Sequence, residues 1–260
     1  MDPVRIATAA GVTTLTLDSP TNRNALSTPL MTRLLTALDE AVADPAVRVV
    51  VISHTGPVFC SGVDLKETAE ARDTGRVPAE LLADVLASLW ECPKPVLARI
   101  GGPARAGGLG LIAAADIAVC TRDATFAFSE VRLGVIPAVI SATVLRRLAP
   151  RAAAELYLTG EVFDGVRAAE VGLVTAAVSA EGLDGAVAAY CDALVRGGPL
   201  ALAGTKELLR RTPAADVHKD LADLSSRSAG FFKSAEGREG VTAFREKRPP
   251  SWVPSPAPGQ

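Results

Sequence analysis

The chain has 260 residues, of which 48% are apolar and 22% are charged, and its formal net charge is −2. This length fits one large domain, or one domain with a small appendage, and is enough to bury a substantial core. No basic excess or basic cluster is present, so we expect no nucleic-acid partner.

The cysteines, the histidines and the apolar stretches indicate whether the protein binds a metal, crosses a membrane or is secreted. The four cysteines are widely spaced, no C-x-x-C pair occurs and only two histidines are present, so we expect no metal site. We interpret the cysteines as small buried residues in a reducing compartment. The N-terminus lacks a basic segment followed by an apolar run, and no apolar stretch approaches twenty residues. We therefore expect a cytoplasmic protein without a membrane span.

The first half of the chain alternates strand and helix patterns. Residues 4–8 and 12–17 predict a hairpin, and Ser27 or Thr28 begins a helix whose apolar residues recur at helical spacing. Further strands are predicted over residues 48–53, 95–100, 117–120 and 125–128, with a helix through Trp90 and a small apolar helix before Asp116. This alternation predicts an α/β fold.

The second half is mostly helical beyond residue 137, with one short strand expected near residues 174–178. We divide the chain into a core over 1–195, a helical region over 196–248 and an extended Pro-rich tail over 249–260.

A first candidate segment, residues 59–65, reads Phe-Cys-Ser-Gly-Val-Asp-Leu and lies between a strand and a helix. Such a junction exposes backbone N–H groups at a helix N-terminus, where an oxygen anion binds well. Asp64 suits the helix cap. Taken alone, the segment is better explained as an ordinary strand–loop–helix turn.

A second segment, residues 99–110, again joins a strand to a Gly-rich loop and a helix. Glycines allow a ligand to approach the backbone closely. A dinucleotide-binding loop is the main rival interpretation, but the glycines do not spell G-x-G-x-x-G and the strand is not the first in the chain. We therefore set the dinucleotide interpretation aside.

A third segment, residues 126–137, contains Glu130 among apolar residues. Burial there raises the pKa of a carboxyl group toward the range that suits proton transfer. Composition alone favours a surface carboxylate or a partner for Arg132 over this catalytic interpretation.

These segments, in this order and spacing, resemble motifs of the crotonase (enoyl-CoA hydratase/isomerase) superfamily. Residues 59–65 resemble F-C-A-G-A-D-[IL]. The run Gly107-Gly108-Leu109-Gly110, with Asp116 further on, resembles G-G-G-x-E-x-x-x-x-x-D, and Glu130, Gly134 and Pro137 match P-E-x-x-x-G-x-x-P in spacing. Residues 22–27 are similar to the CoA-contacting loop of the family, and residues 232–248 to its C-terminal helix. Each motif alone is weak, but five in family order are specific.

The resemblance implies the fold and the roles of the site residues. It implies a crotonase fold, in which repeated ββα turns form a spiral core and C-terminal helices drive trimerisation. It also implies that backbone N–H groups of Val63 and Gly107 form an oxyanion hole, while Glu130 moves the proton. The residues that it implies at the CoA moiety, besides Val63 and Gly107, are Arg23, Ser61 and Leu65.

The resemblance further implies the partners. It points to a homotrimer or a dimer of trimers, in which Phe244 and Lys247 contact the CoA bound to a neighbouring subunit. The substrate it implies is an acyl-CoA thioester. No separate cofactor is expected, because coenzyme A is part of that substrate.

One position departs from the family pattern. Hydratases with two glutamates carry the first one three residues after the oxyanion glycine, where this chain has Gly110.

Hydration of an enoyl-CoA by Glu130 is our first interpretation of the function. The alternatives are enoyl-CoA isomerisation, hydration of a branched substrate of the 3-methylglutaconyl-CoA type, CoA-thioester hydrolysis and a non-catalytic acyl-CoA-binding protein.

The other polar residues are weaker candidates. We expect Asp116 to be structural, His54 to lie in a solvated turn and Arg132 to form a surface salt bridge rather than bind a substrate carboxylate. Glu67 matters only if its segment folds over the site. A Ser-His-Asp hydrolase is not supported, because the G-x-S-x-G motif is absent. We expect the acyl pocket to be walled largely by residues 66–89.

Overall fold

The computed structural model describes residues 2–64, 67 and 78–254. Leu65, which we predicted to contact CoA, lies outside the described residues. So do most of the segment between residues 64 and 78 and the end of the tail beyond residue 254.

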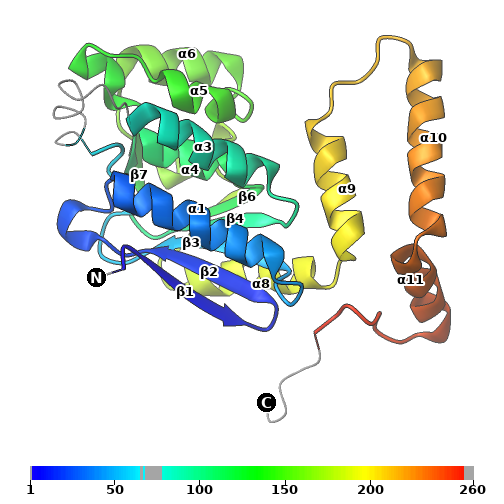
Figure 1. Ribbon diagram of the computed structural model, residues 1–260. Coiled ribbons are helices and arrows are strands. Elements are labelled where there is room, and N and C mark those ends of the chain that lie inside the picture. Colours follow the sequence, from blue (N-terminus) through cyan, green and yellow to red (C-terminus); the bar gives the residue numbers. More distant parts are fainter. Residues whose placement is uncertain (1, 65–66, 68–77, 255–260) are drawn as a thin grey trace.

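Two sheets form the core (Figure 1). The larger has the strand order β1-β2-β3-β4-β6-β9, and all neighbours are parallel except β1 and β2, which form the predicted hairpin. Its strands are β1 (Val4–Ala9), β2 (Val12–Leu17), β3 (Val49–His54), β4 (Val96–Ile100), β6 (Ile117–Thr121) and β9 (Ala176–Val178). The smaller sheet has the order β5-β7-β8, with β5 (Ala104–Arg105), β7 (Thr125–Ala127) and β8 (Phe163–Asp164).

Helices cover both faces of the larger sheet. They are α1 (Thr28–Ala43), α3 (Pro78–Glu91), α4 (Gly107–Ala114), α5 (Ala138–Val144), α6 (Pro150–Thr159), α7 (Gly165–Glu170) and α8 (Leu183–Val195). Strand β3 shows the two faces, because Val50 and Ile52 join the main core whereas Val49 and Val51 pack with α8. Burial on both sides explains why this strand is continuously apolar.

The C-terminal helices form an arm that stands apart from the core (Figure 1). They are α9 (Pro199–Arg210), α10 (Val217–Lys233) and α11 (Ala235–Glu246). Buried Lys206 fastens α9 to the core, because its Nζ lies 2.5 Å from the Asp116 carboxylate and donates to the Lys94 carbonyl at 2.8 Å. Asp116 also accepts from the Val96 N–H, so its expected structural role is confirmed.

The described part of the Pro-rich tail folds back toward the core. Arg48, the residue before β3, donates to the Trp252 carbonyl at 2.8 Å and to the Gly197 carbonyl at 2.6 Å. The Trp252 indole N–H in turn donates to the Arg196 carbonyl. These bonds hold the junction between α8 and α9, from which the arm departs. Within the described residues, no helix has both the length and the apolar character that crossing a membrane requires.

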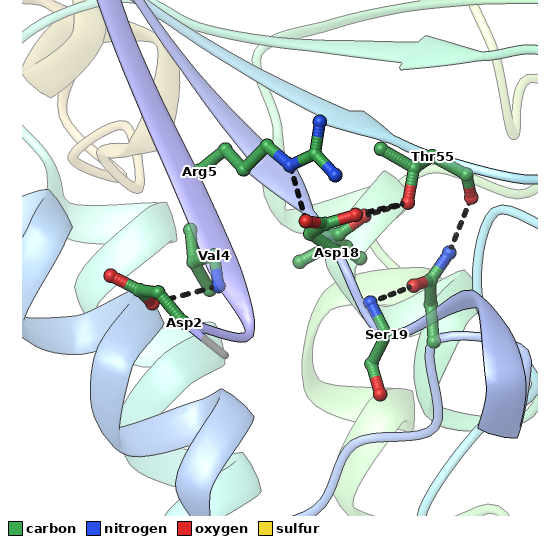
Figure 2. Close-up of polar contacts among 8 residues, drawn as sticks. Asp2, Val4, Arg5, Asp18, Ser19 and Thr55 are labelled. Atoms are coloured by element: carbon green, nitrogen blue, oxygen red, sulfur yellow. Dashed lines mark hydrogen bonds and ion pairs between the residues drawn. The ribbon is translucent and has the colours of Figure 1, made fainter.

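The loop that precedes α1 is fixed by side-chain hydrogen bonds. Figure 2 shows Asp18 between Arg5 and Thr55, both of which donate to its carboxylate. Asn24 is fully buried, accepts from the Ser19 N–H at 2.8 Å, and donates to the Thr55 and Val58 carbonyls at 3.0 and 2.8 Å. The loop over residues 18–24 is thereby joined to the loop that follows β3.

We predict that Asn24→Ala destabilises the protein by about 2–4 kcal/mol, because it leaves three buried backbone groups without their partner. Urea-induced unfolding measures this change. Asn24→Asp is the matched control, since it keeps the size and the acceptor but loses both donors, and it should also destabilise. Unchanged unfolding midpoints in both variants would contradict this assignment.

Candidate active site

A cavity of about 470 Å³ lies where the loops after β3 and β4 meet α3, α5 and the short 3-10 helix η2 (Ser129–Leu133). This volume is in the range of small-molecule sites. The structure brings five of the predicted residues to its wall: Arg23, Ser61, Val63, Gly107 and Glu130. Ala79 and Leu82 of α3 and residues 135–140 complete most of the wall. We expected residues 66–89 to form most of the wall, but in the described part of that segment only Ala79 and Leu82 line the cavity, and residues 129–140 contribute more.

Two backbone segments approach closely at the base of the cavity. Cys60 and Ala104 form a parallel bridge, and the Arg105 N–H donates to the Cys60 carbonyl at 3.0 Å. Gly62, at φ +94°, sits against this contact, and a Cβ atom there would lie 2.9 Å from the Cβ of Ala106. Only glycine fits such an approach and such a backbone angle.

This approach places two unpaired N–H groups in the wall of one cavity. The bridge between Val63 and Leu26 is formed by the residues on either side of Val63. The Leu26 N–H donates to the Gly62 carbonyl, and the Asp64 N–H donates to the Leu26 carbonyl. Gly107 is the first residue of α4, so its N–H has no acceptor within the helix. Among the described residues neither N–H has a hydrogen-bond partner. Two such donors, one of them at the N-terminus of α4, suit an oxyanion.

The turn into α4 has an unusual backbone. Ala106 adopts φ 47° and ψ −118°, a conformation that residues other than glycine rarely occupy. Outliers of this kind cost about 1–3 kcal/mol and occur preferentially at functional sites. Here the strained residue directly precedes Gly107 and turns the chain abruptly from β5 into α4.

Glu130 supplies the carboxylate of the cavity. It lies in the first turn of η2, is half-buried, and burial raises its pKa above the ordinary value of a glutamate. Its Oε2 atom is buried and has no hydrogen-bond partner among the described residues. A carboxylate with a raised pKa and a free oxygen is suited to accept and return a proton.

Gly110 faces side chains of other helices rather than open space. A Cβ atom at this position would lie 2.7 Å from Ile140 Cγ2 and 3.1 Å from Leu86 Cδ1. The room that a first glutamate needs is therefore filled by Ile140, whose side chain lines the cavity. Sequence analysis missed Ile140, because the pairing of a small residue on α4 with a large one on α5 exists only in three dimensions.

Two arginines contribute positive charge to the cavity wall. Arg23 is exposed, adopts a left-handed conformation at φ 59°, and its carbonyl accepts from the Ser61 N–H at 3.1 Å. Arg105, which sequence analysis did not single out, donates to the Thr125 carbonyl and hydroxyl at 2.6 and 3.0 Å. Arg105 is therefore fixed by the protein, whereas Arg23 has the more accessible charge for an anionic ligand.

The arm residues predicted to contact CoA lie elsewhere. Phe244 is on α11 with 85% of its surface exposed, and Lys247 is the residue that ends this helix. Neither lines the cavity of its own chain.

The other polar candidates form salt bridges and hydrogen bonds that stabilise the local structure. Arg132 pairs with Glu161 at the surface, as predicted. Asp64 accepts from the Glu67 N–H at 3.4 Å, as a helix cap does, while the Glu67 carboxylate accepts from the Thr28 N–H and hydroxyl at the start of α1. Among the described residues, no cluster of three or more histidine, cysteine or acidic side chains is arranged to hold a metal ion.

The prediction that His54 lies in a solvated turn is wrong. Its Nε2 accepts from the Gly101 N–H at 3.0 Å, and its ring packs edge-on against Phe59 with 5.5 Å between centroids. The residue is half-buried because the loops after β3 and β4 close over it, and this burial lowers its pKa. The four cysteines are all buried and free, as their interpretation required.

Comparisons with known proteins agree with this architecture. A model of the enoyl-CoA hydratase/isomerase family matches residues 7–254. Carnitinyl-CoA dehydratase of Proteus mirabilis is 35% identical over 221 residues, which cover 80% of this chain and 82% of the relative. The peroxisomal Delta(3,5)-Delta(2,4)-dienoyl-CoA isomerase of Arabidopsis thaliana is 30% identical over an alignment that covers 97% of this chain and 96% of the relative.

A solved structure shows the same fold. The crystal structure of an enoyl-CoA hydratase from Mycobacterium avium is 44% identical and superposes with a TM-score of 0.73, covering 96% of this chain and 98% of that chain. The predicted crotonase fold is confirmed by this likeness. With the family pattern extending over residues 7–254, the chain belongs to the enoyl-CoA hydratase/isomerase (crotonase) family.

Proposed function

We propose that the protein hydrates a 2-enoyl-CoA thioester, with Glu130 as the acid/base. The observation that carries this proposal is a buried Glu130 oxygen without a protein partner among the described residues, in the same cavity as the unpaired N–H groups of Val63 and Gly107. That oxygen is suited to hold a water molecule beside a thioester carbonyl.

The proposed reaction uses the two N–H groups to stabilise charge. When water adds to the β-carbon, electrons move onto the thioester oxygen, and each N–H donor stabilises that oxyanion by about 2.7–4 kcal/mol. Glu130 takes a proton from the attacking water and returns a proton to the α-carbon. The net result is one molecule of water added across the double bond.

The CoA moiety would enter past the positive side of the cavity. Arg23 and Ser61 line this wall. Leu65, the third residue that we predicted at the CoA moiety, lies outside the described residues. An exposed guanidinium suits the phosphates of CoA, because charged hydrogen bonds to phosphate are strong. Coenzyme A belongs to the substrate in this proposal, so the reaction needs no separate cofactor.

The test is the loss of the conjugated enoyl-thioester absorbance of crotonyl-CoA in water. We expect Glu130→Gln to lower turnover by about 10²–10⁴-fold, because it removes the proton acceptor. Since the raised pKa of Glu130 keeps it protonated at acidic pH, wild-type kcat/KM should fall with decreasing pH, beginning above the ordinary glutamate range.

The matched control is Glu40→Gln, which changes an exposed carboxylate on α1 that does not line the cavity. It should keep wild-type turnover. If Glu130→Gln turned over crotonyl-CoA as fast as the control, Glu130 would not be the acid/base.

A second candidate is double-bond isomerisation of an enoyl-CoA, which the apolar contact between Gly110 and Ile140 favours. With one carboxylate, the site can remove a proton from the α-carbon of a 3-enoyl thioester and return it to the γ-carbon, without any water. One of the relatives is named a dienoyl-CoA isomerase. Incubation with a 3-enoyl-CoA separates the candidates, because isomerisation converts it into a 2-enoyl-CoA and raises the conjugated enoyl-thioester absorbance, whereas a hydratase alone leaves the 3-enoyl-CoA unchanged.

We predict that Gly110→Glu alone does not improve hydration and destabilises the protein by about 1–3 kcal/mol, because its side chain overpacks Ile140 and Leu86. Combining it with Ile140→Ala should recover stability and raise the rate of crotonyl-CoA hydration. Urea unfolding and the absorbance assay measure the two effects, with Ile140→Ala alone as control. A stable and faster Gly110→Glu single variant would refute the packing argument.

We propose further that the arm associates with other copies of the chain in a homotrimer or a dimer of trimers. Large apolar side chains are exposed along it: Leu209 at 81%, Phe232 at 67% and Phe244 at 85%. In such an assembly, Phe244 and Lys247 would approach the CoA of a neighbouring subunit.

Sedimentation equilibrium should therefore give a mass of three or six chains, and Phe232→Glu should lower it, because a charge in an apolar contact disfavours association. Glu207→Gln, an exposed change on α9, is the control. A monomeric wild type at micromolar concentration would overturn this proposal.

A further inference from the structure

His54 joins the two loops whose close approach forms the candidate active site. It is the last residue of β3, and its Nε2 accepts at 3.0 Å from the N–H of Gly101, the residue that follows β4. The bond therefore lies where both strands end and both loops begin. Because the acceptor is an imidazole nitrogen, the bond depends on the protonation state of the ring.

Backbone hydrogen bonds continue from this point toward the cavity. The Phe59 N–H donates to the Pro103 carbonyl at 3.0 Å, and the Arg105 N–H donates to the Cys60 carbonyl, also at 3.0 Å. The bond of His54 is thus the first of a series that connects the two loops. The series ends just before the residues that carry the unpaired N–H groups of the cavity.

The two loops touch backbone to backbone along this series. A Cβ atom on Gly102 would lie 2.1 Å from the Pro57 carbonyl oxygen, so no side chain fits between them. The His54 ring also packs edge-on against Phe59, whose side chain is fully buried. Close-packed contacts transmit displacements, because they leave no space that could absorb them. A change at His54 therefore reaches the backbone that leads to the cavity.

The surroundings of the ring favour its neutral form. Since Nε2 accepts a hydrogen bond, the ring proton belongs on Nδ1, which is buried and has no partner among the described residues. The nearby carbonyls of Thr55 and Val58 already accept from Asn24. Burial lowers the pKa of His54, backbone carbonyls offset this in part, and the charge of Arg99 lowers the pKa further.

Charged groups on the elements around His54 are paired with one another. Arg99 of β4 pairs with Asp184 of α8 at 2.6 Å. Asp18, which follows β2, accepts from Arg5 and from Thr55. Residues 55–63 and 100–104 contain no charged side chain. Neither of these two carboxylates is thus left to stabilise a charged imidazole.

We propose that neutral His54 is a positioning residue that holds the two loops together, and that protonation of its Nε2 releases Gly101 and loosens the oxyanion donors Val63 and Gly107. A proton on Nε2 occupies the lone pair that accepts, so that two donors then face one another. Acid would thereby slow the reaction by a second route, besides protonation of Glu130. The effect on catalysis rests on the proposed function, whereas the loop contact can be tested without turnover.

Two substitutions separate the acceptor from the ring. His54→Phe keeps a ring but has no acceptor. His54→Gln places its Oε1 as many bonds from Cα as Nε2 is, so it can accept from the Gly101 N–H, and it cannot be protonated. His218→Gln is the matched control, because His218 is the other histidine of the chain and lies exposed on α10.

Amide hydrogen exchange tests the loop contact directly. At neutral pH we expect the N–H groups of Gly101, Phe59 and Arg105 to exchange about five- to tenfold faster in His54→Phe, because one hydrogen bond of the series is lost. The other two variants should keep wild-type rates. At one acidic pH, wild type should exchange faster than His54→Gln, since only wild type is protonated there.

Unchanged exchange in a folded His54→Phe variant would overturn the inference. So would equal exchange of wild type and His54→Gln in acid, and this comparison decides by itself if His54→Phe does not fold.

Turnover of crotonyl-CoA tests the effect on the site. His54→Phe should lower kcat about tenfold and change KM less than about twofold, because the oxyanion charge develops only in the transition state. His54→Gln should restore kcat, and its kcat/KM should fall less steeply with decreasing pH than that of wild type, because Glu130 alone then titrates. Identical pH profiles would overturn the inference. The expected exchange behaviour without turnover of any enoyl-CoA by wild type would overturn the proposed hydration instead.

Discussion

The candidate site depends on one constraint, the close approach of the backbone after β3 to the backbone after β4. Cys60 and Ala104 pair across this approach, and Gly62 has no room for a side chain beside Ala106. Parallel strands bring their carboxyl ends to the same edge of a sheet, so both loops leave the sheet together. The unpaired N–H groups of Val63 and Gly107 lie in one cavity wall because of this approach.

The chemistry available at the site follows from what surrounds these N–H groups. Glu130 comes from η2, and its buried oxygen is left without a protein partner among the described residues. Ile140 fills the space beside Gly110, so an apolar group occupies the position where hydratases with two glutamates carry the first one. Among the described residues that line the cavity, Glu130 is therefore the one carboxylate.

Much of the fold could be predicted from sequence, because its signals are local. Apolar runs marked β3 and β4, and Ser27 and the spacing of leucines marked α1. The two-residue strands β5 and β8 gave no such signal, since they exist only through pairing with β7. The five site residues in the cavity could be named from motif spacing. By contrast, the contacts of His54, Ile140 and Arg105 depend on residues distant in the chain.

Two adjacent residues of α5 contact different surroundings, because successive helical positions point about 100° apart. Ile140 packs on Gly110 of α4, whereas Val139 is half-buried and lines the same cavity as Glu130. Only residues 134–137 separate η2, which carries Glu130, from α5. The carboxylate of the cavity and the apolar side chain that fills the space beside Gly110 therefore come from one short stretch of the chain, so their relative position is set locally.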